Sequence, residues 1–234
     1  MKKLGFIIFI AALVVGVVIA KFTSFGSSAF NSPASFIFGS KLHGSGNLIS
    51  QTRNTGDFKV VKVGGILNVV INKSDTQSVV VEADDNIAPV IKTRVSSGVL
   101  EIWSDKKFRS KKKVTIRIGS PSISGIDSSG VAKVRYTGID NESLDVESSG
   151  ASKVELEGNV GSIMVESSGA SKVLGEKLVA ENAEVEGSGA AKVLMTVNSK
   201  LRVSASGASR IKYKGDPGVI EKSTSGAASV SKIN

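Results

Sequence analysis

The sequence contains no cysteine, a single histidine and only four prolines among its 234 residues. Without cysteine, the chain has no disulfide, no thiolate metal ligand, no cysteine nucleophile and no cysteine-based lipoprotein anchor. The one histidine, His43, lies at the end of a Ser-, Gly- and Phe-rich stretch, and residues 121–234 contain none. The composition therefore excludes thiol chemistry and provides no imidazole base for the many serines of the second half.

Aromatic residues are scarce in the second half, where residues 121–234 contain only Tyr136 and Tyr213. The net charge of +9 is also unevenly distributed. Residues 1–120 carry 17 Lys and Arg against 7 Asp and Glu, whereas residues 121–234 carry 13 against 14. Nucleic-acid-binding proteins combine a basic face with aromatic platforms. We therefore do not expect nucleic acid as a partner.

What the second half does contain is a short motif, Ser-Gly followed by a small residue, at a nearly fixed interval. The serines are separated by 20, 19, 20, 18 and 19 residues. Such a period indicates a stacked repeat in which each unit buries its apolar face on its neighbours. The six copies are Ser129-Gly130-Val131, Ser149-Gly150-Ala151, Ser168-Gly169-Ala170, Ser188-Gly189-Ala190, Ser206-Gly207-Ala208 and Ser225-Gly226-Ala227.

Between these motifs, apolar and polar residues alternate with a period of two. Leu144 and Val146 are separated by Asp145, and Val154 and Leu156 are separated by Glu155. This alternation is typical of β-strands, and no segment of residues 121–234 has the periodicity of an amphipathic helix. A unit of about 19 residues is long enough for two or three short strands. The pattern predicts an all-β fold, a parallel β-helix or solenoid with ~19-residue coils.

The Ser-Gly step itself is interpreted as the corner of each coil. Glycine adopts a positive φ without steric cost, which suits a sharp turn between two strands. We expect the serine hydroxyls of successive coils to hydrogen-bond to one another or to the corner backbone, and the following Ala or Val to pack in a confined space.

Two charged columns flank the predicted corner. Two residues before each serine lie Asp127, Glu147, Glu166 and Glu186, followed by Ser204 and Ser223. Four residues after each serine lie Lys133, Lys153, Lys172, Lys192 and Arg210, followed by Ser229. Both columns could be solvated strand faces that deter edge-to-edge pairing. The alternative is that the basic column is a regularly spaced binding strip for an acidic polymer.

Residues 44–120 are expected to form irregular β coils that cap the regular repeats of residues 121–234. The expected strands are Val60–Val63, Leu67–Ile71, Val79–Glu82, Val90–Val95, Val99–Trp103 and Val114–Ile118, with a turn at residues 96–98. A basic loop lies between the last two strands. Its charged residues are Lys106, Lys107, Arg109, Lys111, Lys112 and Lys113. They form either a flexible, solvated tip or a contact for anionic lipid or envelope polymers.

The N-terminus carries an export signal. Lys2 and Lys3 precede an uncharged apolar run at residues 4–20, and Lys21 follows it. This run is longer than a usual signal core and short for a membrane span, so residues 1–21 are either a signal peptide or a transmembrane anchor. Residues 22–43 are then a Ser/Gly/Phe-rich linker. In both cases we expect the repeat domain outside the cytoplasm, in the cell envelope.

Several segments together resemble a known family. They are residues 44–47 (Gly-Ser-Gly-Asn), Thr52-Arg53, Asp57-Phe58, residues 80–87, which contain Asp84-Asp85-Asn86, residues 98–102 (Gly-Val-Leu-Glu-Ile) and the Ser-Gly repeats. In this order they are similar to the bacterial head GIN domain family, described as putative auto-transporter adhesins. The resemblance covers residue 44 to the C-terminus. It implies a right-handed parallel β-helix in an envelope or secreted protein, and it supplies no catalytic residue.

These observations favour a non-enzymatic, envelope-exposed binding or adhesion module with no cofactor and no metal. Its expected partners are an acidic polysaccharide, an anionic lipid surface or an envelope protein. One alternative is a structural or regulatory envelope protein that acts through a membrane partner. Another is a β-helix enzyme acting on polysaccharide, which would need converging acids that the acidic column could supply.

Overall fold

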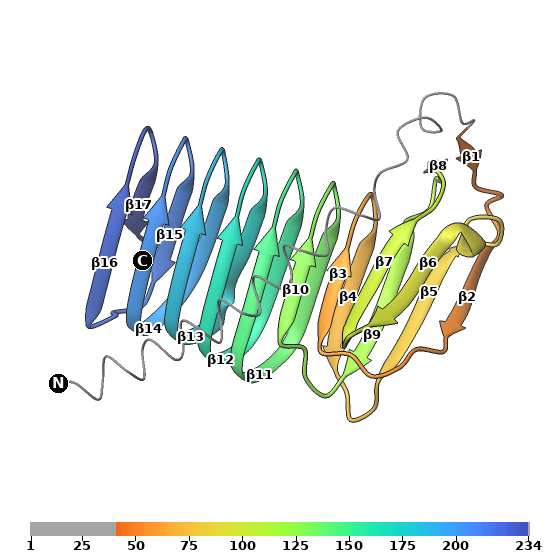
Figure 1. Ribbon diagram of the computed structural model, residues 1–234, viewed down its shortest axis with the longest axis horizontal. Helices are drawn as coiled ribbons and strands as arrows, with labels where there is room; N and C mark the ends of the chain where they lie inside the picture. The colour runs from red at the N-terminus through yellow and green to blue at the C-terminus, as the bar shows by residue number, and fades with distance from the viewer. Residues whose placement is uncertain (1–40, 234) are drawn as a thin grey trace. The chain divides into compact units, whose positions relative to one another are not determined.

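The computed structural model describes residues 41–233, which form seventeen strands and one short 3-10 helix (Figure 1). The helix η1 covers Ala88–Val90. The strands of the N-terminal part are β1 (Leu42–His43), β2 (Leu48–Arg53), β3 (Val60–Val63), β4 (Asn68–Lys73), β5 (Ser78–Asp84), β6 (Ile91–Ser96), β7 (Val99–Ser104), β8 (Phe108–Arg109) and β9 (Thr115–Ser120). The repeats contain β10 (Gly125–Ser128), β11 (Lys133–Ser148), β12 (Lys153–Ser167), β13 (Lys172–Gly187), β14 (Lys192–Ala205), β15 (Arg210–Lys214), β16 (Val219–Thr224) and β17 (Ser229–Lys232).

The repeats build an all-β solenoid of about five turns. Each turn runs along one face, reverses at a Ser-Gly corner and returns along the other face, so a coil has two strand segments (Figure 1). In β12, the segment that begins at Lys153 pairs with β11 and β13 on one face. The segment that ends at Ser167 pairs with the same two strands on the other face. The bend between them lies near Gly158, where the register shifts.

Pairing between coils is parallel from β3 and β4 to the last described strands. On one face the order is β7, β3, β10, then the second halves of β11 to β14, then β16. On the other face it is β9, β4, the first halves of β11 to β14, β15 and β17. The predicted parallel pairing is confirmed, and the coil contains two of the two or three strands that the repeat length allowed.

The core lies between the two faces and consists of stacked aliphatic columns. Val134, Val154, Val173, Val193 and Ile211 stand in register on successive strands, and each is at most 1% exposed. The sequence alternation therefore places one residue in two inside the coil. Burial of such a side chain stabilises the fold by about 1.5–3 kcal/mol.

The N-terminal part adds one coil out of sequence order. β3 and β4 form a coil that lies between β7 and β9 on one side and the first repeat on the other. Its corner is Gly64-Gly65-Ile66, because Val131 N donates to Gly65 O over 3.0 Å as later corners do to one another. Sequence inspection missed this corner, since it lacks the serine.

The far side of this part is closed by antiparallel strands. β6 pairs with β7 through the turn at Ser97-Gly98, and β2 pairs with β5, which pairs with β9. The Arg53 guanidinium donates to Ala88 O at 2.8 Å and to Ile91 O at 3.2 Å, which ties β2 to η1 and β6. All six strands predicted between residues 60 and 118 are confirmed to within a few residues.

The expected membrane segment at residues 4–20 and nearly all of the linker lie outside the described residues. Within residues 41–233, no helix has the length and apolar character needed to cross a membrane.

Candidate binding surfaces

The corners place each Ser-Gly-small motif directly over the one before it. The six corner glycines have φ between 68° and 73°. At Gly169, a Cβ would lie 2.7 Å from Gly150 O, and the next residue's N–H, Ala170 N, donates to that same oxygen at 2.7 Å. Glycine is therefore required both by its backbone angle and by the close approach of the preceding coil.

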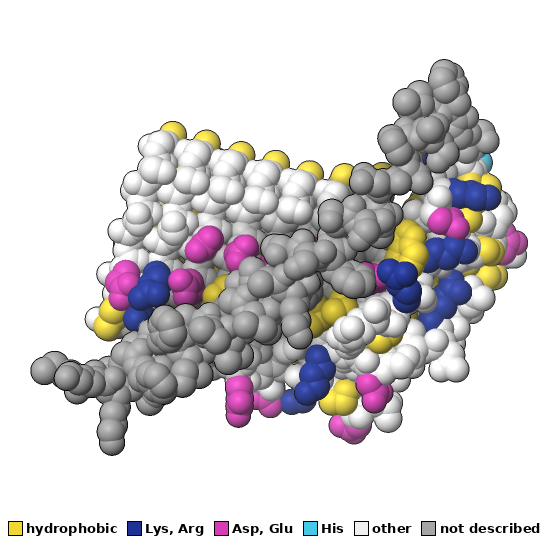
Figure 2. Space-filling view, viewed as in Figure 1, with side chains coloured by type: hydrophobic (Ala, Val, Ile, Leu, Met, Phe, Trp, Pro, Cys, Tyr) yellow, Lys and Arg dark blue, Asp and Glu magenta, His cyan; other side chains and the backbone are white. Residues whose placement is uncertain are grey.

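The small residue after each glycine is exposed, not confined as the sequence suggested. Ala151, Ala170 and Ala190 are exposed, and Val131 is 52% exposed. Figure 2 shows them as a row of apolar side chains along the corner edge. The confined position is one residue later, where Ala132, Ser152, Ser171, Ala191 and Ser209 are buried.

The expected bond from a corner hydroxyl to the corner backbone is seen at Ser129, whose Oγ donates to Val63 O at 3.4 Å, but the paired hydroxyls lie one residue before the corner serine. The corner serines Ser149, Ser168 and Ser188 face outward, whereas Ser148 and Ser167, which precede the first two, are buried. Ser148 Oγ lies 2.8 Å from Ser152 Oγ, and Ser167 Oγ lies 2.8 Å from Ser171 Oγ. Sequence reasoning missed these buried pairs. Their signal in the sequence is a serine one residue before the corner serine together with a serine three residues after it.

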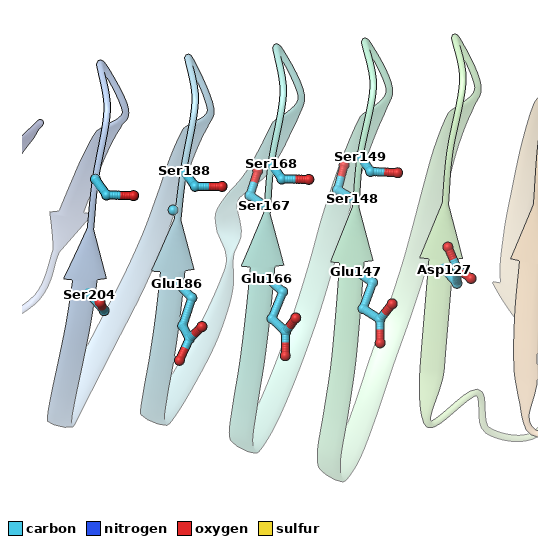
Figure 3. Close-up of a pocket in the computed structure, with 12 residues that line it drawn as sticks. Asp127, Glu147, Ser148, Ser149, Glu166, Ser167, Ser168, Glu186, Ser188 and Ser204 are labelled. Carbon is cyan, nitrogen blue, oxygen red and sulfur yellow. The ribbon is translucent and has the colours of Figure 1, made fainter. Parts of the chain in front are cut away.

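The acidic column lines a groove beside the outward serines. Asp127, Glu147, Glu166 and Glu186 pair in register on successive strands. The groove is open, and Figure 3 shows their carboxylates on one side of the sheet below the corner serines. Only Asp127 has a basic partner in the described chain, Lys62 at 2.7 Å. Sequence reasoning had placed these acids correctly on one line.

Burial and crowding raise the pKa of two of these carboxyls. For Glu147, loss of solvent is the main cause of the raised pKa, and Asp127 and Glu166 add to it while Lys62 opposes it. For Glu166, loss of solvent again comes first, followed by the charge of Glu186. Both glutamates are therefore shifted in the same direction by similar surroundings.

The basic column stands on the opposite face. Lys133, Lys153, Lys172, Lys192 and Arg210 pair in register, followed by Ser229. It is not electrostatically uniform, because Lys153 forms an ion pair with Glu155, which also accepts from Arg135 Nε at 2.7 Å. Hydrogen bonds from Lys153 and Arg135 lower the pKa of Glu155.

The next three coils lack that acid. At the position of Glu155, the register places Leu174, then Leu194, then Lys212. Within residues 41–233, no ion pair involves Lys172, Lys192 or Arg210, and all three side chains are exposed. We call these three residues the cationic strip. Adjacent charges in it are spaced by one strand separation, about 4.8 Å.

The basic loop lies at the N-terminal end of the corner edge. It connects β7 to β9 and so replaces the corner of the outermost coil. Lys106, Lys107, Arg109, Lys111, Lys112 and Lys113 are all exposed. Figure 2 shows basic side chains gathered over this end, where β1, β6 and β7 lie. The structure does not bring the basic loop and the cationic strip together, because the β3–β4 coil and the first two repeats stand between them.

A family model for the putative auto-transporter adhesin, head GIN domain, matches residues 57–217, which include the basic loop and both charged columns. The chain belongs to this family. No match is found among curated protein sequences.

Two solved structures share the fold of this head GIN domain. A putative adhesin from Bacteroides fragilis is 23% identical over 82% of this chain and 100% of its own, with a TM-score of 0.69. A putative adhesin from Parabacteroides distasonis is 20% identical over 83% of this chain and 100% of its own, with a TM-score of 0.51. At these sequence identities, the structural similarity shows that the three proteins share a fold.

A polar cluster links residues 43–47, which precede the head GIN domain, to Asp85 and Asn86 within the domain. Asp85 accepts from Ser45 Oγ at 2.5 Å and from Asn47 Nδ2 at 3.0 Å, and these bonds lower the pKa of Asp85. Asn86 donates to His43 O at 2.7 Å. Asp85 and Asn86 thus fasten the chain before β2. In the described part of the chain, no group of three or more Asp, Glu or His side chains could hold a metal.

Proposed function

We propose that this protein is a non-enzymatic, envelope-exposed binding module whose solenoid binds an acidic polysaccharide along the cationic strip. The family, described as putative adhesins, supports a surface-binding role. The observation that supports an acidic ligand is that the coils after Lys153 lack an acid at the position of its partner, Glu155. Three consecutive coils then present Lys172, Lys192 and Arg210 without a neutralising carboxylate.

The geometry of the strip suits a chain-like ligand better than a single small anion. Parallel stacking holds the three charges in one line about 10 Å long. Leu174, which is partly exposed, and Leu194, which is buried, lie beside the three charged residues and provide apolar surface. A polymer with a carboxylate or sulfate on successive units would contact all three cations together. Each exposed contact is worth about 0.2–1 kcal/mol, so the strip would act through their sum.

The experiment compares binding of the full chain to polygalacturonate, alginate and neutral dextran by titration calorimetry. The test variant carries Lys172→Gln, Lys192→Gln and Arg210→Gln. The matched control carries Lys177→Gln, Lys200→Gln and Lys214→Gln, which remove the same charge from lysines that already pair with Glu157, Glu221 and Glu176.

We expect the full chain to bind the acidic polymers and not dextran. The strip variant should lose roughly tenfold or more in affinity, because up to about 1 kcal/mol is lost at each of three positions. The control should lose at most a few-fold. Equal losses in both variants, or no binding of any acidic polymer, would contradict the proposal.

A polysaccharide-cleaving role for the acidic groove is disfavoured by its uniformity. Glycoside hydrolysis uses two carboxyls whose surroundings push their pKa values apart. Here the same causes raise the pKa of both Glu147 and Glu166. Release of new reducing ends from polygalacturonate or alginate in the same experiments would reverse this assignment.

A further inference from the structure

The basic loop occupies the corner of the outermost coil. In the repeats, four residues join the two faces, for example Ser149–Ser152 between β11 and β12. Between β7 and β9 the connection has ten residues, 105–114, and includes the short strand β8. The loop therefore projects from an edge that is otherwise regular, at the opposite end from the last repeats.

Several contacts hold this loop in one conformation. β8 pairs in parallel with β1, where Leu42 N donates to Lys107 O and Gly44 N to Arg109 O, both at 2.9 Å. Phe108 packs against the core. Ser110 Oγ donates to Asp84 Oδ2 at 2.5 Å and accepts from Lys112 N at 2.9 Å. These contacts hold the backbone of the loop, from which the basic side chains project.

The approach of Gly44 to Asp84 strengthens this arrangement. A Cβ at residue 44 would lie 1.9 Å from Asp84 Oδ2, and Asp84 is only 1% exposed. The buried carboxylate therefore sits between the chain before β2 and the basic loop, with Ser110 as its hydrogen-bond donor. Only glycine at residue 44 allows the two segments to approach so closely.

Most of the basic side chains of the loop have no acidic partner in the described part of the chain. Lys106, Arg109, Lys111, Lys112 and Lys113 are exposed, and none of them forms an ion pair within residues 41–233. Lys41 is also exposed and directly precedes β1. The one acid of the loop, Asp105, pairs with Lys92 at 3.3 Å.

We propose that the basic loop and Lys41 form a docking surface for an anionic lipid membrane, which orients the solenoid with its outermost N-terminal coil toward the bilayer. This surface is separate from the cationic strip, so the inference goes beyond the proposed function. The pairing of β1 with β8 supports lipid as the partner, because it places the charges where the chain enters the solenoid.

The length of the preceding chain agrees with this assignment. The apolar run at residues 4–20 ends twenty residues before Lys41. Twenty residues span at most about 70 Å, so a bilayer that holds the apolar run is within reach of the loop. Basic residues that adjoin a membrane-inserting segment are attracted to anionic headgroups, by roughly fivefold in affinity for each residue.

The test is amine-reactive footprinting of the full chain reconstituted in lipid nanodiscs. Discs of phosphatidylcholine alone are compared with discs that also contain phosphatidylglycerol. We expect acetylation of Lys106, Lys111, Lys112 and Lys113 to slow several-fold in the anionic discs only, while Lys192 reacts equally in both. The protection should disappear at high salt, where the screening length falls to about 3 Å.

Two further arms separate the alternatives. The variant Lys111→Gln, Lys112→Gln, Lys113→Gln should lose the protection of Lys106, whereas the strip variant Lys172→Gln, Lys192→Gln, Arg210→Gln should keep it. Equal reactivity of the loop lysines in both disc types would overturn the proposal, and this arm needs no variant. Protection by soluble polygalacturonate but not by anionic discs would assign the loop to a glycan instead.

Discussion

Ser148 Oγ and Ser152 Oγ lie 2.8 Å apart inside one corner, and Ser152 Oγ also donates to Ser149 O at 2.8 Å. The pair is repeated one coil later by Ser167 and Ser171. In the first repeat, the equivalent of Ser152 is Ala132, and Ser128 Oγ is buried with no hydrogen-bond partner in the described chain. The corner hydroxyls thus form a paired network that is incomplete at its N-terminal end.

Completing that network should stabilise the fold. Ala132→Ser would supply a partner for Ser128 Oγ at a position where Ser152, Ser171 and Ser209 already fit. We expect a gain of about 0.5–1.5 kcal/mol in the free energy of unfolding, measured by urea denaturation. Ala191→Ser is the matched control, because Gly187 stands where the partner serine would be, and its gain should be smaller. A loss of stability in Ala132→Ser would show that the site has no room for the hydroxyl.

Substitution of a corner glycine should be costly. Gly169→Ala places a Cβ at positive φ and 2.7 Å from Gly150 O. We expect a loss of about 2 kcal/mol or more, seen as a lower urea midpoint. Gly56→Ala serves as control, since no atom lies within 4 Å of its Cβ and its φ is not positive. Similar effects of the two substitutions would contradict the corner geometry.

The acidic column should make stability depend on pH. Because burial and neighbouring acids raise the pKa of Glu166 in the folded state, its ionised form opposes folding, and protonation relieves this. Glu166→Gln should therefore stabilise the protein at pH 7 by about 0.2–1 kcal/mol, the scale of a like-charge pair across strands. The gain should shrink as pH falls through the folded pKa. Thermal melting from pH 7 to pH 4 tests this, and an equal gain at every pH would refute the electrostatic cause.

Two of the inner columns end in a lysine in the last described coil, at Lys222 and Lys232. Lys222 continues the column of Val203, and its Nζ lies 4.9 Å from the centroid of the Tyr213 ring and 3.3 Å from Tyr213 Oη. Inward-facing charges discourage a sheet edge from pairing with another chain. Lys222→Met should therefore raise self-association in sedimentation velocity, whereas Lys212→Met on the outer face should not. A monomeric Lys222→Met variant at high concentration would contradict this role.

The repeat, the strand segments and the register of both charged columns could be predicted because period-two alternation and a fixed 19-residue interval are local features of the sequence. The coil formed by β3 and β4 could not, since its Gly64-Gly65 corner lacks serine and its neighbours β7 and β10 are distant in sequence. The pairing of β1 with β8 was also hidden, because two-residue strands carry no periodicity. The ion pair of Lys153 with Glu155 joins residues two apart on the same face of β12, so the period-two alternation also places these two side chains together.

The most direct test of the central claim is the salt dependence of polygalacturonate binding by the wild-type chain and by the Lys172→Gln, Lys192→Gln, Arg210→Gln variant. When binding releases counterions, the logarithm of the binding constant falls linearly with the logarithm of the salt concentration. The slope is set by the number of protein cations that contact the polymer. We predict a steep slope for the wild-type chain and a slope shallower by roughly two to three for the variant. Identical slopes and affinities would show that the cationic strip does not bind the polymer.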